Sequence, residues 1–264
     1  MIKKDEIERS MMQSNSLRRI VSAIFWKLGY ALIPRWRLNH YDFALHLRTL
    51  FTAEAIDCVI DVGANTGQYR DFLRLEVGYQ GRIVSFEPLA TNVVRLRQRA
   101  ALDSKWSIVP VALGREDGEA PLNVTAVNLL SSLREPDPDI VDDYREWSKV
   151  ENREVVQVRR LDGMFDEIVG RLGARRPYLK VDTQGTELDV IEGASGCIDR
   201  VRAMQLEVSI VPLYLGAPPY FETISTARRL GFEVTGIFAV GRVAQMRIVD
   251  LDCVMRRVDA TNRR

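Results

Sequence analysis

The stretch C-V-I-D-V-G-A-N-T-G, residues 58–67, decides the fold. A short apolar run reaches Asp61, and the chain then passes through Gly63 and Gly67 before a segment that begins like a helix at Gln68. A strand, a glycine-rich turn and a helix in this order form the nucleotide-binding crevice of open α/β sheets. Glycine suits such a turn because it tolerates positive φ and lets a ligand approach the backbone. We therefore expect a small-molecule cofactor site at this turn.

Composition excludes several other classes of protein. The 264 residues carry 37 basic and 36 acidic side chains, so no overall positive field favours nucleic acid as a partner. Three scattered cysteines without a C-x-x-C pair predict reduced thiols and a cytoplasmic protein. Two histidines are too few for a His-rich metal site, and we expect no resident metal. No apolar run reaches the roughly 18 residues of a membrane span, and no signal peptide is evident.

The N-terminal 50 residues differ in character from the rest and are predicted to be a helical extension. Apolar residues recur at helical spacing from Leu17 to Leu28, and residues 1–40 hold eight basic but only three acidic side chains. The ordinary interpretation is an amphipathic helix that packs on the domain or covers its site. The alternative is a peripheral membrane contact through residues 17–37, since basic amphipathic helices with tryptophan bind anionic surfaces.

The remaining residues, 51–264, alternate apolar runs with helical patterns. This alternation predicts an α/β domain, a doubly wound and mostly parallel sheet that ends in an antiparallel hairpin. Residues 106–113 are expected to form one strand, and residues 155–158 a short edge strand. Between residues 128 and 152 the periodicity weakens, which is typical of a functional loop or a lid, and we expect it to contact substrate. The expected strands of the main sheet are 58–61, 82–88, 106–113, 177–182, 203–208, 232–238 and 251–256.

Four acids lie at or near the carboxyl ends of predicted strands: Asp61, Glu87, Asp182 and Glu207. Ligands of open α/β sheets bind at this edge, and clustered carboxylates are costly unless a cation or a hydroxyl-rich ligand satisfies them. Glu87 follows Gly67 by 20 residues, the place where related folds bind ribose hydroxyls. Its alternative role is that of a strand-end carboxylate facing water.

The cofactor can be narrowed by elimination. The turn lacks the closely spaced glycine pair of G-x-G-x-x-G, and the chain contains neither Tyr-x-x-x-Lys nor a P-loop. These absences disfavour a nucleotide-sugar oxidoreductase and exclude a P-loop NTPase. The sulfonium and ammonium groups of S-adenosylmethionine suit an acidic rim. A stretch A-P-P-Y, residues 217–220, imitates the motif of amino-group methyltransferases but lacks its amine acceptor and follows the wrong strand.

Six blocks in order resemble the FkbM family of methyltransferases, over roughly residues 50–255. They are I-D-V-G-A-N-T-G-Q-Y (60–69), G-R-I-V-S-F-E-P (81–88), V-A-L-G (111–114), S-S-L (131–133), L-K-V-D-T-Q-G-T-E (179–187) and Q-L-E-V-S (205–209). The resemblance implies a class I Rossmann-like fold, S-adenosylmethionine as cofactor, and O-methylation of hydroxyls in glycolipid or polysaccharide sugars or in polyketides.

Carried over by position, the resemblance implies a cofactor site and a catalytic site. Asp61, Gly63, Asn65 and Gly67 would line the methionine part, Glu87 the ribose, and Ala112 would complete the cofactor site. Asp182 and Gln184 would stand beside the transferring methyl.

Transfer to a weakly acidic hydroxyl needs a general base. Asp182 is the first candidate, and Glu207, Glu187 and His40 are alternatives, although Glu187 also suits a carboxylate at a helix N-terminus. A divalent cation between Asp182 and Glu207 remains possible, as does a non-catalytic binding module of the same fold.

Overall fold

The computed structural model describes residues 24–25, 27–28, 30, 40–139, 142–242 and 247–258. The chain divides into two compact units, Met1–Leu45 and His46–Arg264, and helix α2 (Tyr41–Ala53) spans the division. The helix predicted from Leu17 to Leu28 lies mostly outside the described residues, so the extension and the membrane contact of residues 17–37 stay predictions. Among the described residues, no helix is long and apolar enough to cross a membrane.

Seven strands of the second unit form one sheet in the order β3-β2-β1-β7-β8-β10-β9. The pairings from β3 to β8 are parallel, and β10 runs antiparallel to both of its neighbours. This confirms the predicted doubly wound sheet with a closing antiparallel hairpin. Its strands are β1 (Cys58–Val62), β2 (Arg82–Phe86), β3 (Trp106–Val109), β7 (Pro177–Val181), β8 (Ala203–Ser209), β9 (Phe232–Arg242) and β10 (Ile248–Arg257).

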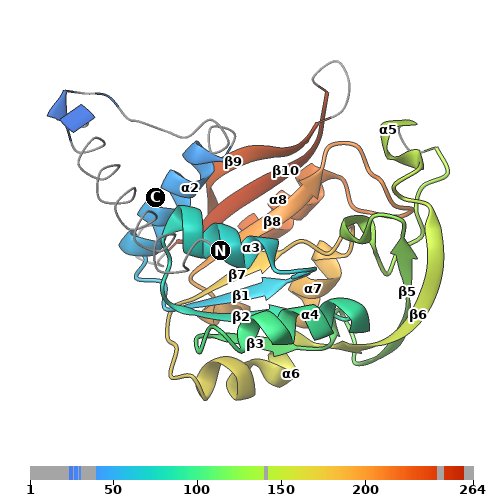
Figure 1. Cartoon of the computed structure of the whole chain (residues 1–264), viewed down its shortest axis with the longest axis horizontal. Coiled ribbons are helices and arrows are strands. Elements are labelled where there is room, and N and C mark those ends of the chain that lie inside the picture. The colour runs from blue at the N-terminus through green and yellow to red at the C-terminus, as the bar shows by residue number, and fades with distance from the viewer. Residues whose placement is uncertain are drawn as a thin grey trace, which may run out of the picture. The chain divides into compact units, whose positions relative to one another are not determined.

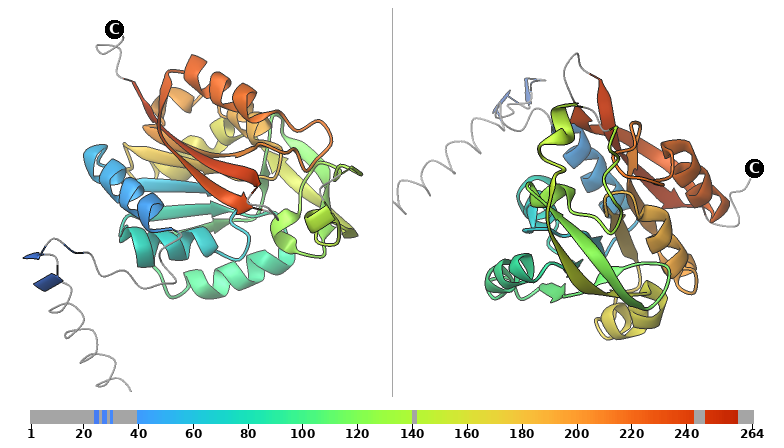
Figure 2. Two further views of the ribbon diagram at one scale, coloured as in Figure 1. Left: turned by 90° about the horizontal axis from the view of Figure 1, so that it is seen from above. Right: turned by 90° about the vertical axis from the view of Figure 1, so that its right-hand side faces the viewer.

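Helices cover both faces of this sheet (Figure 2). In its left-hand view, α3 and α4 lie on one side of the strands, and α7 and α8 lie on the other. Because both faces are covered, all five residues of β1 and of β7 are buried, which explains why both strands are apolar except at Asp61 and Lys180. The helices are α3 (Gln68–Phe72) continued by the π-helical turn η2 (Leu73–Val77), α4 (Ala90–Ala100), α6 (Leu161–Phe165) continued by η4 (Asp166–Gly170), α7 (Glu187–Gly193) and α8 (Tyr220–Arg229).

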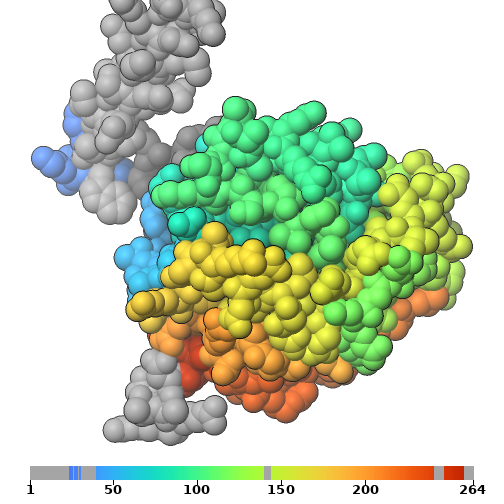
Figure 3. All heavy atoms as spheres, turned by 90° about the horizontal axis from the view of Figure 1, so that it is seen from below, coloured from blue at the N-terminus to red at the C-terminus, as the bar shows by residue number. Residues whose placement is uncertain are grey.

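The core on the face covered by α7 and α8 contains buried residues of β1, β7 and β8 and of the helices α6 and α7. Leu161, Phe165 and Val169 are fully buried at helical spacing and pack against this face. Figure 3 looks onto the β3 edge of the sheet, where the segment of α6 appears in yellow and that of α8 in orange. All three cysteines are buried and unpaired, as expected of reduced thiols.

A second sheet of three strands, β4-β6-β5, corrects two predictions. The strand expected over residues 106–113 ends at Val109, because Pro110 lacks an N–H and the Val111 N–H donates back to the Val109 carbonyl at 3.0 Å. The expected short edge strand over 155–158 is wrong as well, since β6 is ten residues long and lies in the middle of this sheet. The strands are β4 (Ala112–Leu113), β5 (Gly118–Thr125) and β6 (Val150–Arg159).

The second sheet stands at the end of the main sheet toward which β1 points (Figure 1). The segment between β5 and β6, which the sequence left without periodicity, contains two short helices, η3 (Asn128–Leu130) and α5 (Asp142–Arg145). A third short helix, η5 (Ile198–Arg200), precedes β8. The carboxyl ends of the parallel strands therefore face a wall built by β4, β5 and residues 127–147.

Candidate functional site

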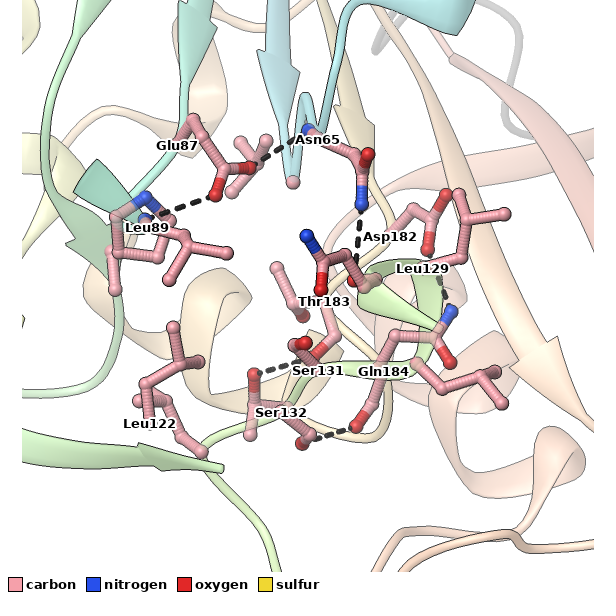
Figure 4. A pocket seen from close by; sticks show the side chains of 18 of the residues that line it. Asn65, Glu87, Leu89, Leu122, Leu129, Ser131, Ser132, Asp182, Thr183 and Gln184 are labelled. Atoms are coloured by element: carbon pink, nitrogen blue, oxygen red, sulfur yellow. Dashed lines mark hydrogen bonds between the residues drawn. The ribbon is translucent and has the colours of Figure 1, made fainter. Parts of the chain in front are cut away.

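A cavity of about 370 Å³ opens at the carboxyl ends of β1, β2, β7 and β8, a size typical of small-molecule sites. Its lining includes seven of the nine predicted site residues (Figure 4). They are Gly63, Asn65, Glu87, Ala112, Asp182, Gln184 and Glu207. Asp61 and Gly67 are not part of the lining.

The glycine turn after β1 lies against the end of β7. Gly63 has a φ of +80°, and a Cβ at this position would lie 1.8 Å from the carbonyl oxygen of Asp182. Only glycine permits this approach. Gly67, at φ +92°, instead packs against the side chains of Arg99 and Trp106, so its part is to let α3 begin close to α4.

Glu87 follows β2 and is held by the backbone on two sides. The Asn65 N–H donates to Glu87 Oε2 at 2.7 Å, and the Leu89 N–H donates to Oε1 at 3.0 Å. Burial raises the pKa of Glu87 to about 7, against these hydrogen bonds, which lower it. A carboxylate offers about four acceptor sites, so the fixed group still has capacity for ligand hydroxyls. This geometry suits the predicted ribose contact.

Asp61 lies behind the cavity wall in a polar row that crosses the sheet. In register, Asp61 stands between Ser85 on β2 and Lys180 on β7, and Lys180 is followed by Gln205 on β8. The Ser85 hydroxyl donates to Asp61 Oδ2 at 2.8 Å, and Lys180 Nζ lies 3.3 Å from Asp61 Oδ1. Asp61 is fully buried.

Lys180 was missed by the sequence reasoning, and it joins this row to the cavity. Its Nζ lies 3.2 Å from Asp182 Oδ2 and within reach of the carbonyls of Val62 and Gly63. The ammonium also lies 5.3 Å from the centre of the Tyr69 ring. Burial opposes its charge, but Asp182 and Asp61 outweigh burial and raise its pKa. A lysine within the apolar run P-Y-L-K-V was the available signal.

Asp182, Gln184 and Glu207 form one hydrogen-bonded group at the rim. Gln184 Nε2 donates to Asp182 Oδ1 at 3.0 Å and to Glu207 Oε2 at 2.6 Å. Burial raises the pKa of Asp182, but Lys180 and the hydrogen bonds from Glu207 and Gln184 outweigh it and lower that pKa overall. Burial and the neighbouring Asp182 raise the pKa of Glu207 well above its usual value. Asp182 is therefore the ionised member of the pair, and Glu207 is the member that binds a proton more readily.

The alternative base Glu187 has a structural role. Glu187 Oε1 accepts the N–H groups of Thr183 and Gly185, each at 3.0 Å, so this carboxylate fixes the turn after β7. His40 belongs to the first compact unit and stays a prediction. The described residues contain no group of three or more His, Cys, Asp and Glu side chains placed to hold a metal.

The segment 128–134 is tied to the same turn, which gives a physical reason for the S-S-L block. The Ser132 hydroxyl donates to the Gln184 carbonyl at 2.7 Å, and the Arg134 Nε donates to the Gly185 carbonyl at 2.7 Å. At the other end, Asn65 Nδ2 donates to the Asn128 carbonyl at 3.0 Å. The segment predicted as a functional loop therefore closes one side of the cavity (Figure 4).

Comparison with known proteins agrees with this arrangement. Residues 61–234 match the model of the Methyltransferase FkbM domain. The chain is 26% identical over 170 residues to the 2-O-methyltransferase NoeI of Sinorhizobium fredii, an alignment that covers 61% of this chain and 67% of that protein.

Solved structures with a similar fold include the fibrillarin of Aeropyrum pernix with bound S-adenosyl-L-methionine, at 13% identity and a TM-score of 0.45, covering 82% of this chain and 76% of that one. The magnesium protoporphyrin IX methyltransferase of Synechocystis, also with bound cofactor, is 10% identical with a TM-score of 0.43, and 98% and 99% of the two chains are covered.

The family match spans most of the parallel sheet and every strand end that lines the cavity from β1 to β8. The close approach at Gly63 and the fixed carboxylate of Glu87 fit S-adenosylmethionine as the methyl donor. The chain belongs to the FkbM family of methyltransferases.

Proposed function

We propose that the protein transfers a methyl group from S-adenosylmethionine to a hydroxyl of a sugar in a glycolipid or polysaccharide. The observation that carries this proposal is the carboxylate of Asp182. It lies on the cavity surface with a third of its side chain exposed, while Lys180 favours its ionised form. A hydroxyl acceptor needs such a hydrogen-bond acceptor at the reacting atom.

The residues of this chain perform orientation and proton removal. The bound donor supplies an electrophilic methyl and a neutral leaving thioether, so no acid is needed for departure. Asp182 accepts the hydroxyl proton, and Lys180 and Gln184 fix its two oxygens. Burial and the neighbouring Asp182 disfavour the charged form of Glu207, which opposes a second negative charge beside the acceptor. Alignment of the nucleophile supplies much of the rate enhancement.

Two observations favour a hydroxyl acceptor. The relative from Sinorhizobium fredii is a 2-O-methyltransferase, which favours a hydroxyl over an amine. The A-P-P-Y stretch lies between β8 and α8, and none of its residues lines the cavity. A polyketide or other small-molecule hydroxyl is the second acceptor class to be assayed.

The test is methyl transfer from labelled cofactor onto neutral glycolipid, polysaccharide and hydroxylated small-molecule fractions. We expect incorporation into a sugar hydroxyl, and we expect Asp182→Asn to lower turnover at least a hundredfold while cofactor affinity changes little. Near-normal turnover in this variant would remove Asp182 as the base. Incorporation only at nitrogen would refute O-methylation.

We also propose that the protein works in the cytoplasm, with residues 17–37 as a peripheral membrane contact if the acceptor is lipid-linked. Co-sedimentation with anionic liposomes of the full chain, compared with a chain that starts at Asp42, tests the contact. Equal sedimentation of both would refute it.

A further inference from the structure

Three large apolar side chains stand exposed at the mouth of the cavity. Leu129 is 55% exposed, Trp147 53% and Val240 43%, and all three line the cavity. They come from separate parts of the chain, namely η3, the turn after α5, and β9. Exposed apolar side chains that gather at a cavity mouth are typical of a ligand-binding surface.

The wall that carries these side chains is held by packing. Tyr144 is buried and meets the Trp147 ring edge to face, with 5.8 Å between the ring centres. Tyr144 also belongs to a buried cluster with Leu130 and Tyr214, whose hydroxyl donates to the Leu130 carbonyl at 2.8 Å. Trp147 is therefore presented to the cavity from a fixed support, which lowers the entropy lost on binding.

The floor below this wall is acidic. Asp182, Glu207 and Asp250 line the cavity from the ends of β7, β8 and β10. Leu129, Asp182 and Gln184 all line the cavity, so the apolar wall and the proposed base face the same space (Figure 4). The Ser209 hydroxyl donates to Asp250 Oδ1 at 2.9 Å, which leaves the second carboxyl oxygen of Asp250 for a ligand.

None of the described residues that line the cavity is a lysine or an arginine. A carboxylate or phosphate on the acceptor would be buried here without a cationic partner, beside groups of its own charge, which is unfavourable on both counts. Hydroxyls, in contrast, donate to carboxylates, and the C–H face of a ring can pack on an aromatic surface.

We propose that Trp147, Leu129 and Val240, together with Asp182 and Asp250 of the same cavity, form an acceptor subsite that takes an uncharged sugar ring and rejects rings that bear an acidic group. The inference rests on the proposed function, which it deepens by defining the acceptor's charge. The ring packs one face on Trp147 and directs its hydroxyls toward the strand ends. Selectivity against anions follows from the lack of lysine and arginine among the described lining residues, whatever the sugar's stereochemistry.

The probes are matched pairs of octyl glycosides, each a neutral hexopyranoside and the corresponding 6-uronate, in the gluco, galacto and manno series. Binding is measured by calorimetry with the donor product S-adenosylhomocysteine present. We expect at least one neutral member to bind at least tenfold more tightly than its uronate. Equal or tighter binding of the uronates, or no binding of any neutral glycoside, would overturn the proposal.

Variants locate the subsite. Trp147→Ala is expected to weaken binding of the neutral glycoside at least tenfold and Trp147→Phe about threefold, with the affinity for S-adenosylmethionine unchanged. Leu102→Ala is the control, because Leu102 is 90% exposed and lies outside the cavity lining. Asp250→Asn is expected to reduce the ratio by which the neutral glycoside binds more tightly than its 6-uronate. An unchanged glycoside affinity in Trp147→Ala would refute the subsite.

These results separate the two proposals. Neutral glycosides that bind through Trp147 without any methyl transfer to a hydroxyl would leave the subsite standing and refute the O-methyltransferase assignment. Methyl transfer to a hydroxyl of a uronate-bearing or phosphorylated ring with unimpaired efficiency would refute the subsite and leave the O-methyltransferase assignment standing.

Discussion

Replacement of Lys180 by methionine tests the most consequential contact of the site. Lys180 is 4% exposed and Asp61 is 0% exposed, so solvent screens this pair very little. Asp61 Oδ1 has no hydrogen bond, and the positive charge of Lys180 Nζ, 3.3 Å away, balances the buried carboxylate. Methionine keeps the length of the side chain but strands the carboxylate of Asp61, with only the Ser85 hydroxyl left to it.

Removal of one partner of a buried ion pair typically costs about 3–5 kcal/mol. For a domain of this size, each kcal/mol corresponds to roughly 2–4 °C in Tm, so Lys180→Met should lower Tm by about 6–20 °C. The raised pKa of Lys180 sets the pH range. Its stabilisation is complete below the unfolded value near pH 10.4 and is lost only as pH rises through the folded pKa. The loss should therefore be the same at pH 6 and pH 9.

Urea unfolding of the full chain measures the effect. The control is Arg171→Met, which removes an ion pair with Glu167 that is 75% and 65% exposed and should change stability by less than about 0.5 kcal/mol. The double variant Lys180→Met/Asp61→Asn should recover a substantial part of the loss, with a coupling of about 1–3 kcal/mol. A loss below about 1 kcal/mol, or no recovery in the double variant, would show that Asp61 does not depend on Lys180.

Two further outcomes follow from the same geometry. Gly63→Ala should weaken S-adenosylmethionine binding at least tenfold or abolish it, as measured by calorimetry, because the new Cβ would lie 1.8 Å from the Asp182 carbonyl oxygen. The control is Gly78→Ala, because Gly78 has the same left-handed φ but nothing within 4 Å of a new Cβ. This control should lower stability by only about 1–2 kcal/mol and leave binding intact. Burial raises the pKa values of Glu87, Glu187 and Asp252 to about 7, so between about pH 4.5 and 7 the folded state holds more protons than the unfolded state. The free energy of unfolding without cofactor, measured in urea, should therefore fall as pH rises through that window, by roughly 1 kcal/mol per group and pH unit. A free energy of unfolding that rises instead would contradict the burial of these carboxyls.

The order of elements and the position of the rim could be predicted from local patterns, because buried parallel strands and glycine turns leave clear signals in one dimension. Glu87 and Asp182 directly follow their strands and Glu207 lies near the end of β8, and the structure brings all three to one cavity. Asp61 shows the limit of this reasoning. It lies inside β1 rather than beyond it, so its side chain points to one face of the sheet and meets its cross-strand neighbours.

What the sequence could not supply is register and the second sheet. The pairing of Asp61 with Lys180 depends on which residue of β7 stands opposite β1, and no local pattern specifies that. In the same way, β6 reads as a short apolar strand because the residues on its open face are charged, while its full length comes from pairing with β5. The position of Trp147 at the cavity follows from this pairing and from the packing of Tyr144, both of which are long-range contacts.

The period of two along a strand explains how one lysine serves two acids. Lys180 and Asp182 are two residues apart, so the ammonium can reach the carboxylate at the rim while it also pairs with Asp61 across the sheet. The rest of the acidic rim has no basic side chain in the described lining, and the cavity is left complementary to positive charge. A cationic donor gains from this field, and a neutral thioether product does not. The same arrangement that keeps Asp182 ionised therefore favours the donor over the product.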